Sequence, residues 1–375
     1  MNTELFQFLR AQRGSDLHLS AGTAPRVRIH GALCPVDAPA STSEDITALV
    51  HELLTPAAMS PVASNIGLLS GEERLQQFEQ TGDLDFVCEL RLPPCATDTE
   101  PTARYRVNCF RQRRGLSVVF RAIPKRVPTL AELGLSDQTQ ELLQNLALLP
   151  KGLVLVTGPT GCGKSTTLAA IIDHANTVRH DHILTIEDPV EFIHTPRTCL
   201  INQREVGQDS LSFGAALRGA LREDPDIILV GEMRDRETIS LALEAAETGH
   251  LVFATLHTAS APKAIDRIIQ VFPPEEQTQI RTGLSESLQA VLAQTLFCRA
   301  DQEGRLPALE IMLGTPAVRN LIRENKIFQL PSVLQTSHAV GMQTLDDDIE
   351  RLIRLHHITP DVAKLHLKDK NRLDD

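Results

Sequence analysis

A phosphate-binding loop constrains the fold of this 375-residue chain more than any other feature of its sequence. Residues 158–165 read Gly-Pro-Thr-Gly-Cys-Gly-Lys-Ser, which matches the pattern G-x-x-x-x-G-K-[ST], and the apolar run Leu153–Val156 comes directly before them. Such a loop joins a buried strand to a helix. It turns backbone N–H groups toward phosphate oxygens, and the helix adds the positive end of its dipole. The sequence therefore predicts that the chain binds a nucleoside triphosphate.

The residue types of the loop predict what each member does. Lys164 is expected to reach the β- and γ-phosphates, and the hydroxyl of Ser165 is expected at Mg²⁺. The other expected nucleotide contacts lie in the loop and the first turn of its helix: Gly158, Thr160, Gly161, Cys162, Gly163 and Thr166. ATP and Mg²⁺ are thus the expected ligands.

Three further apolar runs follow the loop, at Ile183–Ile186, Ile227–Val230 and Leu251–Leu256. None of them alternates with polar residues, which is typical of strands buried on both faces of a parallel sheet. They predict a P-loop, RecA-like α/β core over residues 134–274. No run of comparable strength follows, so residues 275–375 are predicted to form a helical C-terminal region.

The first 124 residues have a different pattern, in which short runs of period two alternate with turns. Three segments are predicted to be strands: Asp16–Ser20, Arg26–His30 and Tyr105–Phe110. Two segments are predicted to be helices: 44–54 and 71–80. Together they predict a small α+β domain over residues 1–124, with an exposed loop at 91–102. The proline-containing, basic segment 125–133 predicts a linker.

Polar residues come after each apolar run, at the strand ends where α/β sheets bind ligands. Glu187 to Glu191 follow the first run, Glu232 follows the second after one glycine, and His257 follows the third. Carboxylates can hold Mg²⁺ or polarise an attacking water, and an imidazole can contact a γ-phosphate. Any one of these acids alone could be a solvated loop carboxylate. Three strand ends beside one P-loop favour a shared site.

His250 differs from His257 because it comes before its strand, after the predicted helix 238–248 and Gly249. It is therefore predicted at the opposite end of that strand, outside the nucleotide site. Two interpretations stay open for it. One is a capping or surface histidine, and the other is a contact with a neighbouring subunit.

Composition narrows the classes of function. Aromatic residues make up 3% of the chain, with no Trp, which disfavours the base-stacking surfaces of single-strand nucleic-acid binders. No apolar run approaches the roughly 20 residues that cross a bilayer, and the N-terminus lacks the pattern of a secretory signal. The seven cysteines show no C-x-x-C pair, which predicts a reducing, cytoplasmic setting without a structural zinc site.

The charge of the chain is unevenly distributed. The net charge is −11, yet residues 101–131 contain no acid and eight basic residues, so the remainder carries −19. We call these eight residues the basic strip: Arg104, Arg106, Arg111, Arg113, Arg114, Arg121, Lys125 and Arg126. A solvated basic face and a surface for DNA phosphates are both open interpretations of it.

Four ordered segments identify a resemblance to a family. Residues 158–165, 187–191, 222–235 and 248–258 resemble the Walker A, Asp-box, Walker B and His-box sequences of the secretion-superfamily ATPases. The closest resemblance is to type IV pilus retraction ATPases of the PilT type. It extends almost end to end, because residues 14–22 resemble that family's N-terminal opening and Ala317–Glu324 is similar to its C-terminal signature.

The resemblance implies a homohexameric ring with a PAS-like N-terminal domain. It implies that ATP is bound between that domain and the RecA-like core, and that hydrolysis drives pilus retraction in twitching motility. Its expected partner is an inner-membrane platform protein, so the chain would be cytoplasmic and meet the membrane only through that protein.

The resemblance also implies roles for individual residues. Glu191 would be the catalytic base, Glu232 the Walker B acid at Mg²⁺, and His257 a sensor of the γ-phosphate. Arginines of the N-terminal domain, of which we select Arg106 and Arg113, would bring positive charge to the nucleotide. That role for the basic strip requires neither nucleic acid nor a membrane.

Three alternative functions remain. A related pilus-assembly or type II secretion ATPase usually carries a long N-terminal extension and a four-cysteine zinc module, neither of which is expected here. A nucleotide-binding regulatory subunit of such a ring could lose Lys164, Glu191, Glu232 and His257, but all four are present. A DNA-pumping ATPase would use the basic strip on phosphates. One departure from the family is that segments 71–80 and 91–102 are long for its N-terminal domain.

The segment Ala317–Glu324 is predicted to be an amphipathic helix. Val318, Leu321 and Ile322 recur at i, i+3 and i+4, which predicts one buried stripe. The polar members of the segment are predicted to face outward: Arg319, Asn320 and Arg323. Such a helix could be a plain surface element, or it could pass ATP-driven motion to the pilus machinery.

Overall fold

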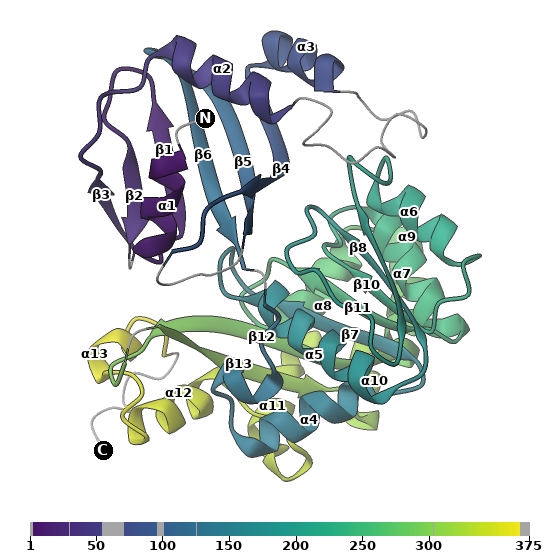
Figure 1. Ribbon diagram of the computed structural model, residues 1–375. Coiled ribbons are helices and arrows are strands. Elements are labelled where there is room, and N and C mark those ends of the chain that lie inside the picture. The colour runs from purple at the N-terminus through teal and green to yellow at the C-terminus, as the bar shows by residue number, and fades with distance from the viewer. Residues whose placement is uncertain are drawn as a thin grey trace. The chain divides into compact units, whose positions relative to one another are not determined.

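The computed structural model describes residues 3–29, 31–54, 71–95, 101–124, 126–302 and 304–367. The chain forms two compact units, and Figure 1 shows the helices and strands of each. The N-terminal unit comprises residues 1–126 together with 205–211. The C-terminal unit comprises residues 127–204 and 212–375.

The N-terminal unit is built on a six-stranded antiparallel sheet in the order β3-β2-β1-β6-β5-β4. Its strands are β1 (Asp16–Ser20), β2 (Arg26–Ile29), β3 (Ala32–Pro35), β4 (Asp83–Arg91), β5 (Thr102–Gln112) and β6 (Gly115–Ile123). Its helices are α1 (Thr3–Ala11), α2 (Ser43–Leu53) and α3 (Gly71–Thr81). The predicted strands and helices of this region are confirmed; His30 and residues 96–100 of the expected loop lie outside the described residues.

Period-two patterning gives this sheet one buried face. Tyr105 and Val107 are buried while Arg104 and Arg106, between and beside them on β5, are partly exposed, as the alternation predicts. Phe6 of α1 packs on the buried face, with its ring centroid 5.1 Å from that of Tyr105 and 4.9 Å from that of Phe120. The helices thus cover one face of the sheet, and the arginines of β5 lie on the other.

The C-terminal unit contains a seven-stranded sheet in the order β13-β12-β7-β11-β10-β8-β9. Its strands are β7 (Gly152–Thr157), β8 (His182–Glu187), β9 (Leu200–Glu205), β10 (Ile227–Val230), β11 (Leu251–Leu256), β12 (Leu288–Cys298) and β13 (Arg305–Leu313). Strands β12, β7, β11, β10 and β8 are parallel, and β13 is antiparallel to β12. The parallel strands bring their carboxyl ends, and the polar residues that follow them, to one edge.

The chain crosses this sheet in two directions, which places helices on both of its faces. Right-handed crossovers put α5 on one face and α6 to α9 on the other, where Figure 1 groups α6, α7 and α9. The helices are α4 (Asp137–Ala147), α5 (Lys164–Val178), α6 (Phe213–Ala220), α7 (Arg236–Thr248), α8 (Ala261–Gln270) and α9 (Pro274–Ser287). The predicted RecA-like fold class is confirmed.

The prediction of a helical C-terminal region after residue 275 requires a correction. Helices α10 (Pro316–Arg323), α11 (Leu330–Thr336), α12 (Leu345–Arg354) and α13 (Pro360–Ala363) are present, with short 3-10 turns between them, but β12 and β13 come first. The sequence of β12 is rich in Leu, Ala and Gln, which favour helices, and it is buried almost throughout, so no alternation marks it as a strand. The nucleotide-domain sheet therefore extends well beyond residue 274.

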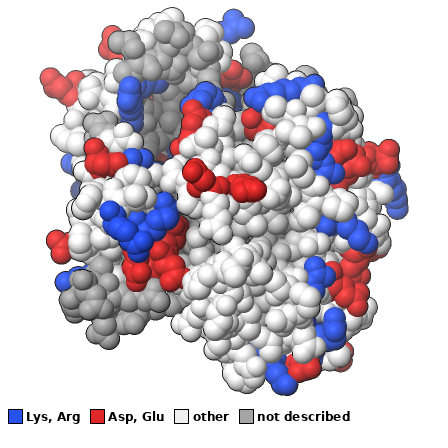
Figure 2. Space-filling model, turned by 90° about the horizontal axis from the view of Figure 1, so that it is seen from below, with Lys and Arg blue, Asp and Glu red and all other residues white. Residues whose placement is uncertain are grey.

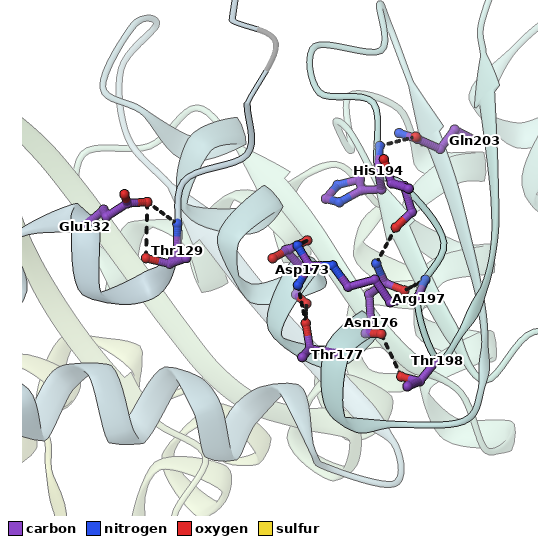
Figure 3. Close-up of polar contacts among 10 residues, drawn as sticks. Thr129, Glu132, Asp173, Asn176, Thr177, His194, Arg197, Thr198 and Gln203 are labelled. Atoms are coloured by element: carbon purple, nitrogen blue, oxygen red, sulfur yellow. Dashed lines mark hydrogen bonds and ion pairs between the residues drawn. The ribbon is translucent and has the colours of Figure 1, made fainter.

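The predicted linker is shorter than 125–133. Lys125 lies outside the described residues, and Arg126–Thr129 form neither helix nor strand. Residues Leu130–Leu133 form a 3-10 helix, η3, whose start is capped because the carboxylate of Glu132 accepts a hydrogen bond from the backbone N–H of Thr129 at 2.8 Å, as Figure 3 shows. None of the helices in the described part of the chain is long and apolar enough to span a membrane.

Candidate nucleotide site

The P-loop connects the end of β7 to the start of α5, as its sequence predicts. Gly158, Gly161 and Gly163 have φ angles of 148°, 78° and 89°, in the range that other residues rarely adopt. At two of these positions space is also lacking. A Cβ on Gly158 would lie 2.4 Å from the carbonyl oxygen of Gln294, and a Cβ on Gly163 would lie 2.8 Å from Nε2 of the same glutamine.

Lys164 lies where the loop meets the helix and is 8% exposed. Its ammonium donates hydrogen bonds to the carbonyl oxygens of Gly158, at 2.9 Å, and Pro159, at 3.2 Å. No side chain caps the N-terminus of α5, so the backbone N–H groups of the first turn can meet an anion. Thr160 and Gly161 are exposed at the loop tip, and Ser165 and Thr166 are half-buried in that first turn.

Cys162 carries the thiol of the loop, and its surroundings make that thiol a weak nucleophile. It is buried, and burial raises the pKa of its thiol although Lys164 acts in the opposite sense. A thiol is a poor nucleophile compared with a thiolate. Cys162 thus serves the loop through its backbone.

The end of β7 is tied to the residues that follow β11. The hydroxyl of Thr157 accepts a hydrogen bond from the backbone N–H of Thr258 at 2.8 Å, and it lies 2.9 Å from the carbonyl oxygen of Thr258. His257, directly before Thr258, is therefore held beside the strand that leads into the P-loop.

His257 meets the acid that follows β10. Its Nε2 lies 3.3 Å from Oε1 of Glu232, whose other oxygen accepts from Arg234 at 2.6 Å. Burial alone would raise the pKa of Glu232, but the hydrogen bonds and charges of Arg234 and His257 outweigh it and lower that pKa. Glu232 is consequently ionised at neutral pH. The structure thus brings together two of the residues that the sequence predicted for the site.

The acids that follow β8 form a second group. The carboxylate of Glu187 accepts a hydrogen bond from the hydroxyl of Thr185 at 2.7 Å and another from the backbone N–H of Glu191. Burial raises the pKa of Glu187 to about 7, and the nearby charge of Glu191 adds to the effect. A Cβ on Gly231 would lie 3.1 Å from the Cα of Glu187, so this group adjoins the strand that carries Glu232.

The loop that begins at Glu191 is fixed at both ends by side-chain amides, which Figure 3 shows. Gln203 donates to the carbonyl oxygen of Phe192 and accepts from the N–H of His194, both at 2.8 Å. Asn176 of α5, fully buried, donates to the carbonyl oxygen of Thr195 at 2.9 Å and accepts from the N–H of Arg197 at 3.0 Å. The helix that starts at the P-loop therefore also holds the loop that carries Glu191.

The same cluster contains charged and titratable groups. Arg197 forms an ion pair with Asp173 at 3.2 Å and donates to the hydroxyl of Thr177 at 2.7 Å. His194 is buried beside them, and burial lowers its pKa to about 4. The histidine is neutral at physiological pH, so it contributes packing to this loop.

The two arginines selected from the basic strip belong to the N-terminal unit. Arg106 pairs with Asp85 of the neighbouring strand at 2.6 Å, and Arg113 is exposed in the two-residue turn between β5 and β6. Arg121 pairs with the buried Asp16 at 2.8 Å. Two members of the strip therefore have acidic partners. Figure 2 shows basic and acidic side chains next to one another at several places on the face drawn, with a broad uncharged area between them. The strip is not a bare positive field.

His250 lies at the other end of β11 from His257, as predicted. Its Nδ1 is 3.0 Å from the carbonyl oxygen of Ala245 in the last turn of α7, and Gly249 between them has a φ of 134°. Of its two interpretations, the geometry supports the helix-capping one.

The C-terminal signature forms α10, with one correction to its predicted faces. Val318 and Ile322 are fully buried and Asn320 and Arg323 are exposed, as expected, but Leu321 is only half-buried. Arg319 does not face outward freely. Its guanidinium donates to the carbonyl oxygens of Gly314 at 2.6 Å, Glu286 at 2.7 Å and Leu288 at 2.9 Å. It thereby satisfies carbonyls at the end of α9, which hydrophobic periodicity cannot show.

Sequence reasoning also missed the amide residues of this site. Gln294, Gln203 and Asn176 make the hydrogen bonds that fix its loops, yet none belongs to a recognised motif. Gln294 lies on β12, whose composition predicts a helix, so its position beside the strand that leads into the P-loop could not be inferred. Within the described residues, no group of three or more His, Cys, Asp or Glu side chains could hold a metal ion by itself.

Comparison with known proteins places this geometry in a family. Residues 96–351 match the model of the family described as type II/IV secretion system protein. The chain is 50% identical over 351 residues to the "Type IV pilus retractation ATPase PilT" of Pseudomonas aeruginosa, covering 94% of this chain and 93% of that protein. It is 47% identical over 365 residues to the "Twitching motility protein" of Neisseria gonorrhoeae, covering 96% and 90%.

A solved structure agrees over the whole length. The "Crystal Structure of the Pilus Retraction Motor PilT and Bound ADP" aligns with a TM-score of 0.80 at 40% identity, covering 100% of this chain and 98% of that one. Combined with the intact P-loop, these matches identify a nucleotide-binding, ATP-hydrolysing enzyme. The chain belongs to the type II/IV secretion system protein family and, within it, to the PilT-type ATPases of type IV pilus retraction.

Proposed function

We propose that this ATPase is the hexameric motor that drives type IV pilus retraction in twitching motility. The observation that carries the proposal is the strand-end arrangement of the C-terminal unit. There the P-loop follows β7, and the Glu232–His257 pair is formed by residues that follow the adjacent strands β10 and β11. Fixed charges at one edge of a rigid sheet are what phosphoryl transfer requires, because its catalysis consists largely of positioning and electrostatics.

Each site residue has a proposed role. Lys164 exchanges its two carbonyl partners for the β- and γ-phosphates, and the N–H groups from Gly158 to Thr166 surround the same oxygens. Glu191 accepts the proton of the attacking water. His257 contacts the γ-phosphate and, through its contact with Glu232, reports whether that phosphate is present.

The donor set fits Mg²⁺. The hydroxyl of Ser165 and the ionised carboxylate of Glu232 are oxygen ligands of the type that this ion prefers, and it usually takes its other ligands from phosphates and water. When bound, the ion would neutralise charge that develops on the phosphate oxygens. Arg234 keeps Glu232 deprotonated for that purpose.

The remaining elements of the proposal concern assembly. The chain forms a homohexamer in which Arg106 and Arg113 bring positive charge to a bound nucleotide. It acts in the cytoplasm on an inner-membrane platform protein and needs neither nucleic acid nor direct contact with lipid. The similarity in length and sequence to a pilus retraction motor supports this assignment.

The experiment counts pilus retraction events in a strain that lacks the gene. We expect retraction to cease, to return with the wild-type gene, and not to return with Lys164→Ala. Pili that are lost from the surface instead of persisting unretracted would favour the alternative of an assembly or type II secretion ATPase. A purified wild-type protein that binds ATP without hydrolysing it would favour the regulatory subunit.

A further inference from the structure

Strand β12 passes directly beneath the P-loop, and one of its side chains reaches into it. Gln294 is 2% exposed, and both ends of its amide are used. Its Nε2 donates to the carbonyl oxygen of Cys162 at 2.6 Å, and its Oε1 accepts from the hydroxyl of Thr167 at 2.8 Å. Every polar atom of this buried side chain therefore bears on the P-loop or on the first turns of its helix.

The geometry of a peptide unit gives the first bond a consequence for phosphate binding. The carbonyl of Cys162 and the N–H of Gly163 belong to one planar trans peptide and point in opposite directions. A partner that holds the carbonyl on the strand side therefore aims that N–H away from β12, into the loop. Rotation of this peptide changes ψ of Cys162 and φ of Gly163, and glycine, with a φ of 89° at position 163, resists such a change least. The peptide thus needs an external partner to keep its direction.

The second bond fixes which end of the amide faces the loop. An amide rotated by half a turn would present Oε1 to the Cys162 carbonyl, placing two acceptors against each other. Thr167 prevents this, because its hydroxyl, in a residue that is 1% exposed, donates to Oε1. Thr167, Gln294 and Cys162 thus form a directed chain of hydrogen bonds from α5 to the loop.

We propose that Gln294 is a positioning residue that aims the Cys162–Gly163 peptide of the P-loop at the phosphates of the nucleotide, with Thr167 setting the orientation of its amide. This inference rests on the proposed nucleotide site but assigns a residue outside every recognised motif. It also explains why the loop has glycine at two of its positions. The backbone of Gln294 lies 2.4 Å from where a Cβ on Gly158 would be, and its Nε2 lies 2.8 Å from where a Cβ on Gly163 would be.

The test compares Gln294→Met with the same exchange at Gln329, an exposed residue of the C-terminal unit. Methionine keeps the length of the side chain but cannot donate to a carbonyl. We expect Gln294→Met to weaken binding of ADP and of ATP by about tenfold, equal to about 1.4 kcal/mol. The melting temperature in the absence of nucleotide should also fall, because the Cys162 carbonyl and the Thr167 hydroxyl each lose a partner. Gln329→Met should change neither quantity.

Substitutions at Thr167 provide a second, independent test of the proposal. Thr167→Val removes the hydroxyl while keeping the shape, and we expect about threefold weaker nucleotide binding; Thr167→Ser keeps the hydroxyl and should rescue most of the loss. The double variant Gln294→Met/Thr167→Val should bind no more weakly than Gln294→Met alone, because both changes break one chain of bonds.

Two results would overturn the inference. One is a Gln294→Met protein that melts earlier yet binds nucleotide and turns over as the wild type does, which would make Gln294 a purely structural residue. The other result is a Thr167→Val protein that binds nucleotide as tightly as Thr167→Ser does. This second result decides the question if Gln294→Met does not fold. In either case a normal wild-type ATPase activity leaves the proposed function standing, whereas an inactive wild type would refute that function instead.

Discussion

Asp16 and Arg106 of the N-terminal unit differ from Lys164 and Glu187 of the C-terminal unit in the kind of partner that holds each charged group. In the N-terminal unit, the buried Asp16 meets Arg121 at 2.8 Å across neighbouring strands, and Arg106 meets Asp85 at 2.6 Å. At the nucleotide edge of the C-terminal unit, Lys164 donates to two carbonyl oxygens, which carry no net charge, and Glu187 accepts from a hydroxyl and a backbone N–H. Asp16 and Arg106 are thus paired with groups of opposite charge, whereas Lys164 and Glu187 are held by neutral groups. Glu232, at the same edge as Lys164, is paired with Arg234.

The pKa values of Asp16 and Glu187 are shifted in opposite directions by these different partners. Burial acts to raise the pKa of both Asp16 and Glu187, but hydrogen bonds from Arg121 and Ser15 outweigh it for Asp16, whose pKa is lowered. For Glu187 burial prevails, and its pKa rises to about 7. A charge held by neutral partners remains available to a charged ligand. The comparison therefore separates a carboxyl whose ionised form is stabilised by an arginine from a carboxyl whose ionisation burial opposes.

The largest expected effect comes from removing a charge that neutral groups hold. Lys164→Ala should lower ATP turnover by about a hundredfold or more, because the β- and γ-phosphates lose their fixed cation. Glu232→Ala should also impair turnover, and its effect on nucleotide binding should be smaller than its effect on turnover. The reason is that the carboxylate of Glu232 is paired with Arg234, so removing it takes no cation away from the phosphates. Steady-state hydrolysis and nucleotide titration measure both. A Lys164→Ala protein that keeps most of its turnover would break the comparison.

The next effect uses the pH dependence of stability. Folded Glu187 binds a proton that the unfolded chain releases, so the stability this group contributes is complete below about pH 4.5 and is lost as pH rises through about 7. Glu187→Gln should therefore raise the melting temperature at about pH 8, where the gain is at most about 2 to 3 kcal/mol, and have little effect at about pH 5.

Asp16→Asn is the matched control in the other unit. The lowered pKa of Asp16 means that its stabilisation is present above the unfolded value and is lost as pH falls. This variant should lower the melting temperature at about pH 8 and converge with the wild type in acid. If both variants shift stability in the same direction at about pH 8, the two units do not differ in the way described.

Some of this site could be predicted from the sequence, and the reasons are physical. The P-loop, Glu232 and His257 lie at fixed distances after strongly apolar strands, so the parallel sheet that those strands must form also brings the residues together. Strand β12 could not be recognised in the same way, because Leu, Ala and Gln favour helix and both of its faces are buried. Its place in the sheet is set by tertiary packing against β7.

The second kind of failure concerns polar side chains. Periodicity predicted the buried stripe of α10 but placed Arg319 outside, although its guanidinium reaches three carbonyl oxygens. A long side chain can fold back over the turn that precedes it, and no one-dimensional pattern records which carbonyls remain without partners there. Gln294 was missed because its strand has the composition of a helix and because its partners lie more than 120 residues away in sequence.

A smaller effect is expected on α10, where two arginines separate stability from function. Arg319, like Lys164, donates to carbonyls, but it fills three of them, two at the end of α9 and one at Gly314 before α10. Arg319→Ala should therefore cost about 2 kcal/mol in the free energy of unfolding. Arg323 is exposed, and Arg323→Ala should leave stability within about 0.5 kcal/mol. Denaturant unfolding measures both.

The same pair tests the proposed use of this helix. If α10 passes motion to the pilus machinery, Arg323→Ala should stop retraction while ATP hydrolysis stays near the wild-type rate. Normal retraction in Arg323→Ala, with defects confined to Arg319→Ala, would reduce the helix to a stabilising element.

The smallest effect is expected at the locally neutralised pair Arg106–Asp85. Both side chains are partly exposed, at 39% and 44%, so the pair should contribute under about 1 kcal/mol to stability.

If Arg106 serves only the sheet, Arg106→Ala and Asp85→Asn should have the same small effect on unfolding and none on turnover. If Arg106 serves the nucleotide in the ring, Arg106→Ala should lower turnover several-fold, whereas Asp85→Asn, which keeps the guanidinium and removes its charged partner Asp85, should not. Arg113→Ala, which removes an exposed arginine of the β5–β6 turn, should follow Arg106→Ala in that case. Light scattering should show an unchanged oligomer for all three. Full turnover in both arginine variants, together with binding of duplex DNA at physiological salt, would show that the basic strip binds nucleic acid and does not serve the nucleotide.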